Sequence, residues 1–281
     1  MRLAKRAGSF TLRGTMEPKD MFDTGGEAPP ATPAATLVIF RNDPEGGPPQ
    51  LLMVERSNAM RFAGGAAVFP GGRVDEADRA FAMALGASDA DACDELAARI
   101  AAVRETLEET GLALGIRQRA TLDEARRARA LLLDGGELAP VLAAMGWELD
   151  LEMLVPFARW RPKHREIRVF DTRFYLADLG TGAVELLVDS TENTHLFWAS
   201  AQGALDLADS GKIKVIFPTR RNLERLALFS TFNDALAHVA VFPSQMISPF
   251  MEERGGERWL MIPDDAGYPV TGEKLETAAR G

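Results

Sequence analysis

The sequence has little of what several classes of protein require. Cysteine occurs once, at Cys93, so no disulfide framework is available, and the three histidines show no metal-ligand spacing. No apolar run reaches the roughly 18 residues of a membrane helix, and no signal-peptide pattern opens the chain. Gly-x-Ser-x-Gly elbows, Gly-Lys-Ser/Thr phosphate loops and paired cysteine motifs are missing as well. These absences predict a soluble, cytoplasmic protein and give several enzyme classes no support.

Positive charge is also in short supply. The 281 residues carry a formal net charge of −9, and the sequence pI is near 5.0. No Lys/Arg cluster is large enough to indicate a basic face, which argues against a nucleic-acid partner. An acidic chain that binds an anionic substrate therefore needs a local basic patch or a bound cation.

The pattern of apolar residues predicts one domain, residues 34–270, between a disordered leader (1–33) and a tail (271–281). Strands are predicted at 35–40, 51–54, 66–69, 168–176, 195–198 and 259–262, the first two forming a hairpin. Helices are predicted at 91–112, 121–145 and 219–239, with a short one after Ser200. Strands and helices mixed without βαβ alternation indicate an α+β sandwich with a mixed sheet.

The most informative stretch is residues 104–112, Arg-Glu-Thr-Leu-Glu-Glu-Thr-Gly-Leu. At 100° per residue, its helix has an apolar stripe on one face: Leu96, Ile100, Val103 and Leu107. Glu105, Glu108 and Glu109 lie opposite, where a solvated face with Arg104 paired to Glu108 is one interpretation. Glu105 and Glu109 are like charges four residues apart, which is unfavourable by a few tenths of a kcal/mol. A divalent cation such as Mg²⁺ or Mn²⁺ would neutralise these carboxylates.

With the upstream Phe-Pro-Gly-Gly of residues 69–72, this stretch resembles the Nudix hydrolase signature. That signature is a glycine, five residues, an acid, seven residues, then Arg-Glu-x-x-Glu-Glu-x-Gly. The resemblance implies an α/β/α sandwich and magnesium-dependent hydrolysis of a nucleoside diphosphate linked to another group. It also implies roles for individual residues: metal ligation by Glu105, Glu108, Glu109 and the Gly71 carbonyl, and orientation of the glutamates by Arg104.

Two departures from the signature stand out. Its early acid is Asp78 rather than glutamate, and 25 residues (79–103) separate it from Arg104 where the signature has seven, so 18 are extra. The family's early glutamate helps to tie the loop to the helix, so the role of Asp78 stays open. The insertion is expected to lengthen the catalytic helix and to add a turn before it. Thr106 also stands where the signature prefers an aliphatic residue.

A second motif precedes the first: Arg56-Ser57, three residues, Arg61, three residues, Gly65, three residues, then Phe-Pro-Gly-Gly. It resembles the motif of coenzyme A diphosphatases, which implies substrate binding by Arg56, Arg61, Gly65 and Gly72. Arginine forks bind phosphates bidentately, although each arginine alone is also an ordinary solvent-facing residue.

The interrupted signature, residues 168–174, the helix after Pro218 and the segment 262–265 are similar to one branch of that family. This branch contains the peroxisomal acyl-coenzyme A diphosphatases and their bacterial relatives. The chain carries no C-terminal Ser-Lys-Leu, so the resemblance does not imply peroxisomal targeting. Glu192 lies where many relatives carry a downstream acid, and it is either a further ligand or general base, or a solvent-exposed glutamate.

The favoured hypothesis is therefore hydrolysis of coenzyme A or an acyl-coenzyme A to 3′,5′-ADP and a phosphopantetheine. The alternatives are a diphosphatase for ADP-ribose, a dinucleotide or a nucleotide sugar, and a non-catalytic ligand sensor. The helix at 219–239 has more apolar residues than one buried stripe needs. Either it walls an acyl-arm channel together with the insertion, or it packs on the sandwich or on a second subunit of a homodimer.

Overall fold

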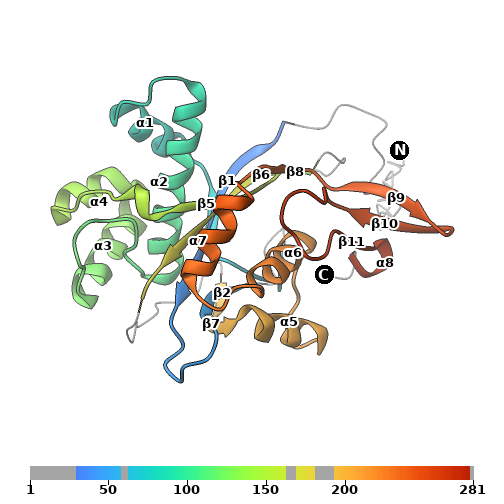
Figure 1. Ribbon diagram of the computed structural model, residues 1–281. Helices are drawn as coiled ribbons and strands as arrows, with labels where there is room; N and C mark the ends of the chain where they lie inside the picture. The colour runs from blue at the N-terminus through green and yellow to red at the C-terminus, as the bar shows by residue number, and fades with distance from the viewer. Residues whose placement is uncertain (1–29, 58–62, 163–168, 181–192, 279–281) are drawn as a thin grey trace, which may run out of the picture.

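The computed structural model describes residues 30–57, 63–162, 169–180 and 193–278. Among these residues, eight strands form one mixed sheet that runs through the middle of the molecule (Figure 1). Its strands are β1 (Thr32–Arg41), β2 (Gln50–Arg56), β3 (Ala67–Val68), β4 (Gly71–Arg73), β5 (Val155–Trp160), β6 (Phe170–Asp178), β7 (Asn193–Ser200) and β8 (Met246–Ile247). The α+β fold with a mixed sheet is thereby confirmed.

Strand β1 is the centre of this sheet. Its residues from Leu37 to Phe40 are fully buried, as expected for a strand covered on both faces. It runs parallel to β6, and one edge is shared between β2, which pairs at Phe40, and β4, which pairs at Thr36. The predicted β1–β2 hairpin is confirmed, and β4, which the sequence did not predict, places the Gly-Gly segment beside β1.

Helices cover both faces of the sheet (Figure 1). One face carries α1 (Glu76–Ala84), α2 (Ala90–Thr110), α3 (Leu122–Gly135) and α4 (Leu138–Met145). The other face carries α5 (Ala201–Asp209), α6 (Phe217–Leu226) and α7 (Phe232–Val241). Each layer buries its own apolar cluster, so the sheet separates two cores.

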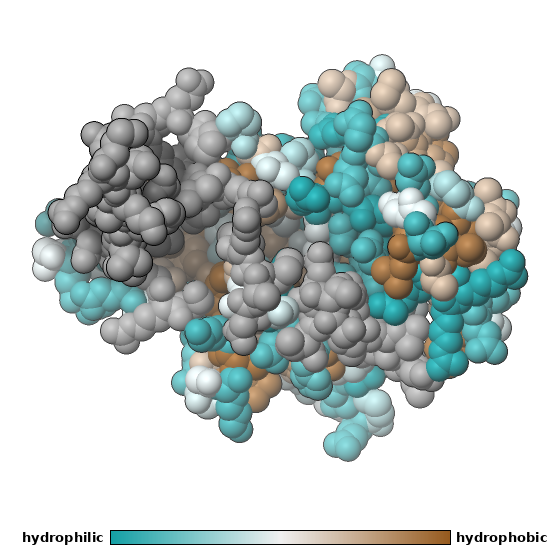
Figure 2. Space-filling view, turned by 180° about the vertical axis from the view of Figure 1, so that it is seen from behind, coloured by the Kyte–Doolittle hydropathy of each residue, from teal (hydrophilic) through white to brown (hydrophobic). Residues whose placement is uncertain are grey.

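Helix α2 begins and ends where the sequence predicts. The side chain of Asp89 accepts a hydrogen bond from the Ala92 amide, and Gly111 ends the helix in the left-handed conformation at a φ of 74°. The 18 extra residues therefore form most of α1 and the first turns of α2 (Figure 1). In Figure 2 the α1 end of the molecule, at the upper right, is largely pale brown, and Met83 and Leu85 are exposed there.

Several predicted boundaries are wrong. The helix predicted at 219–239 is two helices, because Thr231 caps α7 by accepting a hydrogen bond from the Asp234 amide. The helical segment at 121–145 is likewise broken, because Gly136 adopts the left-handed conformation. Thr32 and Pro33, which were assigned to the leader, belong to β1.

The predicted tail also belongs to the fold. Residues 272–278 form β11 (Gly272–Lys274) and α8 (Leu275–Ala278). With β9 (Phe250–Arg254) and β10 (Glu257–Met261), β11 makes a separate three-stranded sheet that extends to the right in Figure 1. A 3₁₀ turn, Leu151–Met153, precedes β5, and no helix in the described part of the chain is long and apolar enough to cross a membrane.

The proposed acyl-arm channel between the insertion and the C-terminal helix is also wrong, because α1 and α2 lie on one face of the sheet and α6 and α7 on the other. Most of the surplus apolar residues pack into the core beneath α5 to α7, whereas Leu228 is exposed. Leu223, Leu226 and Phe229 are buried, and Phe232 packs edge-to-face on Phe40 with a centroid distance of 5.2 Å. The helix therefore packs on the sandwich.

Candidate active site

The Gly71–Gly72 segment lies where only glycine fits. Gly71 has a φ of +154°, and a Cβ there would collide with the carbonyl oxygen of Ala35 on the neighbouring strand. A Cβ on Gly72 would collide with the carboxylate of Glu105. The two glycines therefore let β4 approach β1 on one side and an acidic side chain of α2 on the other.

Two of the three signature glutamates at the C-terminal end of α2 face this strand rather than water. The backbone amide of Gly71 donates a 2.9 Å hydrogen bond to Oε2 of Glu109, whose exposed fraction is 5%. The side chain of Glu105 is 16% exposed and lies over Gly72. The interpretation of this helix face as a solvated surface is therefore wrong, because its acids are covered by β4.

The third glutamate lies at the rim of the same group. Glu108 is 33% exposed, and its Oε2 lies 3.5 Å from Nη1 of Arg104. Its backbone carbonyl accepts a hydrogen bond from Nε of Arg129 on α3. Glu108 is therefore the most accessible of the three acids, and Glu105 and Glu109 form the inner part of the group.

The crowding of negative charge changes the acidity of Glu105. Burial raises its pKa, and the neighbouring carboxylates Glu109 and Glu108 raise it further, against the lowering effect of Arg104, to about 8. A carboxylate in this environment gains most from an added positive charge close to it. The group is thus short of cations at the place where the signature expects a metal.

Arg104 is buried and contacts several of these acids. It is 3% exposed, and its Nε and Nη2 each lie 3.0 Å from an oxygen of Asp78, while Nη1 lies 3.0 Å from Oε1 of Glu105. Its Nη2 also donates to the carbonyl of Arg73 at 2.9 Å. Burial by itself lowers the pKa of Arg104, but the hydrogen bond with Asp78 and the nearby acids raise it overall, so the guanidinium stays charged.

The structure shows a role for Asp78, the early acid of the signature. It is 2% exposed and pairs with Arg104, so it ties the strand–helix connection to α2 in spite of the insertion. Its Oδ2 also accepts a hydrogen bond from the Asp75 amide, which completes a capping box at the start of α1. This contact could not be predicted from the sequence, because 25 residues separate Asp78 from Arg104. Periodicity within one helix gives no information on a contact with a residue outside that helix.

The second motif is only partly within the described residues. Arg56 ends β2, and its Nε is buried without a hydrogen-bond partner among the described residues. Gly65 has a φ of 74°; its amide donates to the Arg56 carbonyl, and the Arg56 amide donates to the carbonyl of Ala66. This pattern is a glycine bulge that redirects the chain into β3, which explains why the motif requires glycine at that position. Arg61 and Glu192 lie outside the described residues.

The donors of the α2 group suit a hard divalent cation. Carboxylate oxygens are the ligands that such cations prefer, and the site has more acids than cations. In the present side-chain positions, Glu105 and Glu109 are engaged by Arg104 and by the Gly71 amide. Accordingly, no three acidic, histidine or cysteine side chains of the described ranges converge as a complete metal site. The residues therefore fit a cation in chemistry, and binding would require these carboxylates to exchange partners.

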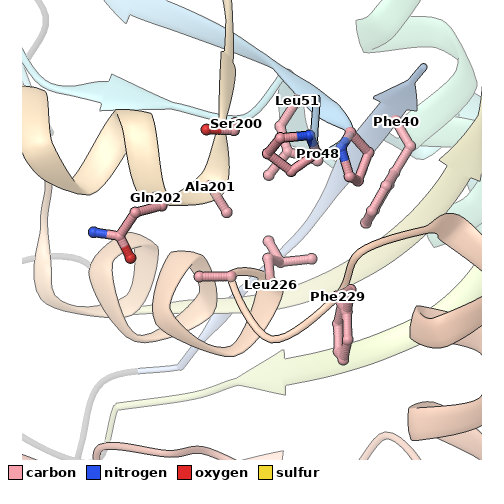
Figure 3. Close-up of a pocket in the computed structure, with 10 residues that line it drawn as sticks. Phe40, Pro48, Leu51, Ser200, Ala201, Gln202, Leu226 and Phe229 are labelled. Carbon is pink, nitrogen blue, oxygen red and sulfur yellow. The ribbon is translucent and has the colours of Figure 1, made fainter. Parts of the chain in front are cut away.

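One hollow in the described surface lies away from this acidic group. Figure 3 shows a small pocket of about 110 Å³ between Phe40, Leu51, Leu226 and Phe229. It lies at the Phe40 end of β1, whereas Gly71 pairs with Thr36 in the middle of that strand. Its labelled polar side chains are those of Ser200 and Gln202, and it contains no acid, so it does not belong to the acidic site.

The chain is similar to known proteins. The family model described as the NUDIX domain matches residues 31–133. A crystal structure of a NUDIX hydrolase from Alicyclobacillus acidocaldarius is 30% identical, with a TM-score of 0.62, and the match covers 74% of this chain and 96% of that one. The acyl-coenzyme A diphosphatase NUDT19 of Gallus gallus is 28% identical over 299 residues, or 81% of this chain and 76% of that protein.

The domain match spans β1 to α3 and thus contains the glycines of β4, Asp78 and the acids of α2. The structural relative is covered almost completely by this chain, so the likeness extends beyond the motif to the fold. Taken with the geometry of Arg104 and the glutamates, these findings show that the chain belongs to the Nudix hydrolase family.

Proposed function

We propose that this Nudix hydrolase cleaves the diphosphate of coenzyme A or an acyl-coenzyme A, giving 3′,5′-ADP and the corresponding phosphopantetheine. The observation that carries the proposal is the buried acidic group of α2 pressed against Gly71 and Gly72, directly downstream of the Arg56–Gly65 motif. The similarity to an acyl-coenzyme A diphosphatase over 81% of the chain supports the choice of substrate.

In this proposal Glu105, Glu108 and Glu109 hold Mg²⁺ or Mn²⁺, with the Gly71 carbonyl as a further ligand. When bound, such an ion withdraws charge from phosphate oxygens and lowers the pKa of a coordinated water. Arg104, which is held by Asp78, keeps Glu105 in place through the 3.0 Å contact between Nη1 and Oε1. Glu192 is proposed as a further acid of the site, either as a ligand or as the general base.

Substrate binding is assigned to the upstream motif. Arg56 carries a buried Nε without a partner among the described residues, and it lies at the end of β2 next to the bulge. A guanidinium with unused donors suits a phosphate group, which accepts two parallel hydrogen bonds. Arg61 of the same motif is proposed to bind the phosphate with Arg56. Gly65 and Gly72 are proposed to give the backbone the conformation that lets the substrate approach.

The experiment that tests the proposal is hydrolysis of a panel of diphosphates by the full chain with Mg²⁺ or Mn²⁺. The panel contains coenzyme A, an acyl-coenzyme A, ADP-ribose, a dinucleotide and a nucleotide sugar, with products identified by mass. We expect coenzyme A or its thioester to have the highest kcat/KM and 3′,5′-ADP to be a product. A higher kcat/KM for ADP-ribose or a nucleotide sugar would overturn the substrate assignment while leaving the family intact.

A further inference from the structure

We infer that Lys214, in the turn between α5 and α6, binds the 3′-phosphate of the substrate together with Arg56. The inference rests on the proposed function, because it concerns how the same site distinguishes coenzyme A from substrates that lack this phosphate. No sequence pattern indicates Lys214, which lies 142 residues after Gly72, so only the fold reveals its position.

The backbone brings Lys214 into line with the upstream motif. The Ala67 amide donates a 2.7 Å hydrogen bond to the Lys214 carbonyl, and Ala66 and Lys214 form a parallel β-bridge. On its other side, Ala66 accepts a 3.0 Å hydrogen bond from the Arg56 amide. Arg56, Ala66 and Lys214 therefore form one row across three chain segments, with the two cationic residues about 10 Å apart in backbone position.

Both side chains belong to the face of the sheet that carries α2. Ile213 and Val215, on either side of Lys214, pack into the core of α5 to α7, so Lys214 between them is directed to the opposite face. In β2, Val54 packs in the core of α2, and Arg56 follows it two residues later on the same face. The row thus presents its two cations on the side where Glu105 and Glu109 lie.

Charge favours an anionic ligand at this row. The chain has a net charge of −9 and only six lysines, and one of these stands here, exposed. Lys214 forms no ion pair with any described residue, and Arg56 keeps a buried Nε without a partner among them. A free lysine in an acidic protein, next to an unsatisfied arginine, is an attractive position for a phosphate monoester.

The separation from the acidic group suits one small ligand. Ala66 and Gly71 are five residues apart, so their backbones are separated by at most about 18 Å. In coenzyme A the 3′-phosphate and the diphosphate hang from the same ribose, so a compact substrate can reach both the row and the α2 acids.

The test uses Lys214→Gln in the full chain and compares two probes by calorimetry: adenosine 3′,5′-bisphosphate and adenosine 5′-monophosphate. We expect the variant to weaken binding of the bisphosphate by about tenfold, the loss of one charge-assisted contact, and to leave the monophosphate unchanged. Lys214→Arg, which keeps the charge, should retain most of the affinity. Lys274→Gln, which removes a lysine paired with Glu257 on the second sheet, should bind both probes like the wild type.

Kinetics separate this inference from the proposed function. With coenzyme A and dephospho-coenzyme A as substrates, Lys214→Gln should raise KM for coenzyme A only, with kcat unchanged. Equal losses on both probes, or a wild-type protein that binds the bisphosphate no better than the monophosphate, would overturn the role of Lys214. Failure of the wild type to hydrolyse coenzyme A would instead overturn the proposed function, and the binding comparison would still decide the inference.

Discussion

Each face of the sheet buries arginine side chains, and Arg104 and Arg225 are held in opposite ways. On α2, Arg104 is surrounded by acids: Asp78 and Glu105 at 3.0 Å, Glu108 at 3.5 Å and Asp75 at 3.6 Å. On α6, Arg225 is 2% exposed and donates to neutral acceptors, the carbonyls of Phe157 and Phe242 and Nε2 of His238. Nearby acids raise the pKa of Arg104, whereas burial lowers that of Arg225.

The difference shows that a buried charge does not by itself mark a functional site. Arg225 is stacked on the ring of Phe157 at 4.3 Å and joins α6 to β5 and to the end of α7, which is a packing role. Arg104 is accompanied by more negative charge than one guanidinium neutralises, and that excess lies beside glycines that leave the backbone accessible. The excess of negative charge, rather than burial, distinguishes the site of Arg104 from that of Arg225.

The largest expected effect is the loss of kcat when the excess negative charge is removed. Glu105→Gln and Glu109→Gln should each lower kcat by about a hundredfold or more, because each removes a charged group that positions the reaction. The thermal unfolding midpoint should fall little, since both variants keep the shape of the side chain. Initial rates at saturating Mg²⁺ and a melting curve measure the two quantities. Near wild-type turnover in either variant would falsify the assignment of the α2 acids.

The second prediction concerns the buried ion pair between Asp78 and Arg104. Asp78→Asn should lower the free energy of unfolding by about 3–5 kcal/mol, because it leaves a buried guanidinium without its main counter-charge. It should also lower kcat, because Arg104 then holds Glu105 less firmly. The matched control is Asp94→Asn, which breaks a partly exposed ion pair with Arg79 in the same insertion and should change stability by about 1 kcal/mol or less. Similar effects of the two substitutions would contradict the role of Asp78.

The third prediction separates packing from chemistry. Arg225→Met should lower the free energy of unfolding by about 1–3 kcal/mol, because the carbonyls of Phe157 and Phe242 lose a donor. Below its unfolding temperature, the variant should keep a kcat close to that of the wild type. Arg220 lies on the same helix as Arg225 and forms a surface ion pair with Asp209 of α5, so Arg220→Met is the stability control. A large loss of kcat in a folded Arg225 variant would mean that the two faces do not differ as described.

Much of the catalytic face could be predicted from the sequence, because its signals are local. The cap at Asp89, the end of α2 at Gly111 and the collection of acids on one side of the helix follow from positions within one segment. That those acids are covered rather than solvated follows only from β4, a three-residue strand whose glycines carry no periodicity.

Contacts across long stretches of chain could not be predicted. The Asp78–Arg104 pair is hidden by the insertion, and the Ala66–Lys214 bridge joins segments that no sequence pattern relates. On the other face, the break between α6 and α7 depends on a single cap at Thr231. The apolar pattern continues to Phe232 and therefore predicts one unbroken helix. The channel hypothesis was wrong for the same reason: amphipathic patterns identify a buried face but not the side of the sheet to which it packs.

The most direct test of the account is calorimetric titration of Mn²⁺ into the full chain, its Glu105→Gln/Glu109→Gln double variant and Arg220→Met. We expect the wild type and Arg220→Met to bind the ion alike. We expect the double variant to lose about tenfold or more in affinity, because neutral amide oxygens replace the carboxylates of Glu105 and Glu109. An unchanged dissociation constant in a folded double variant would contradict the claim that the buried acids of α2 are the metal site.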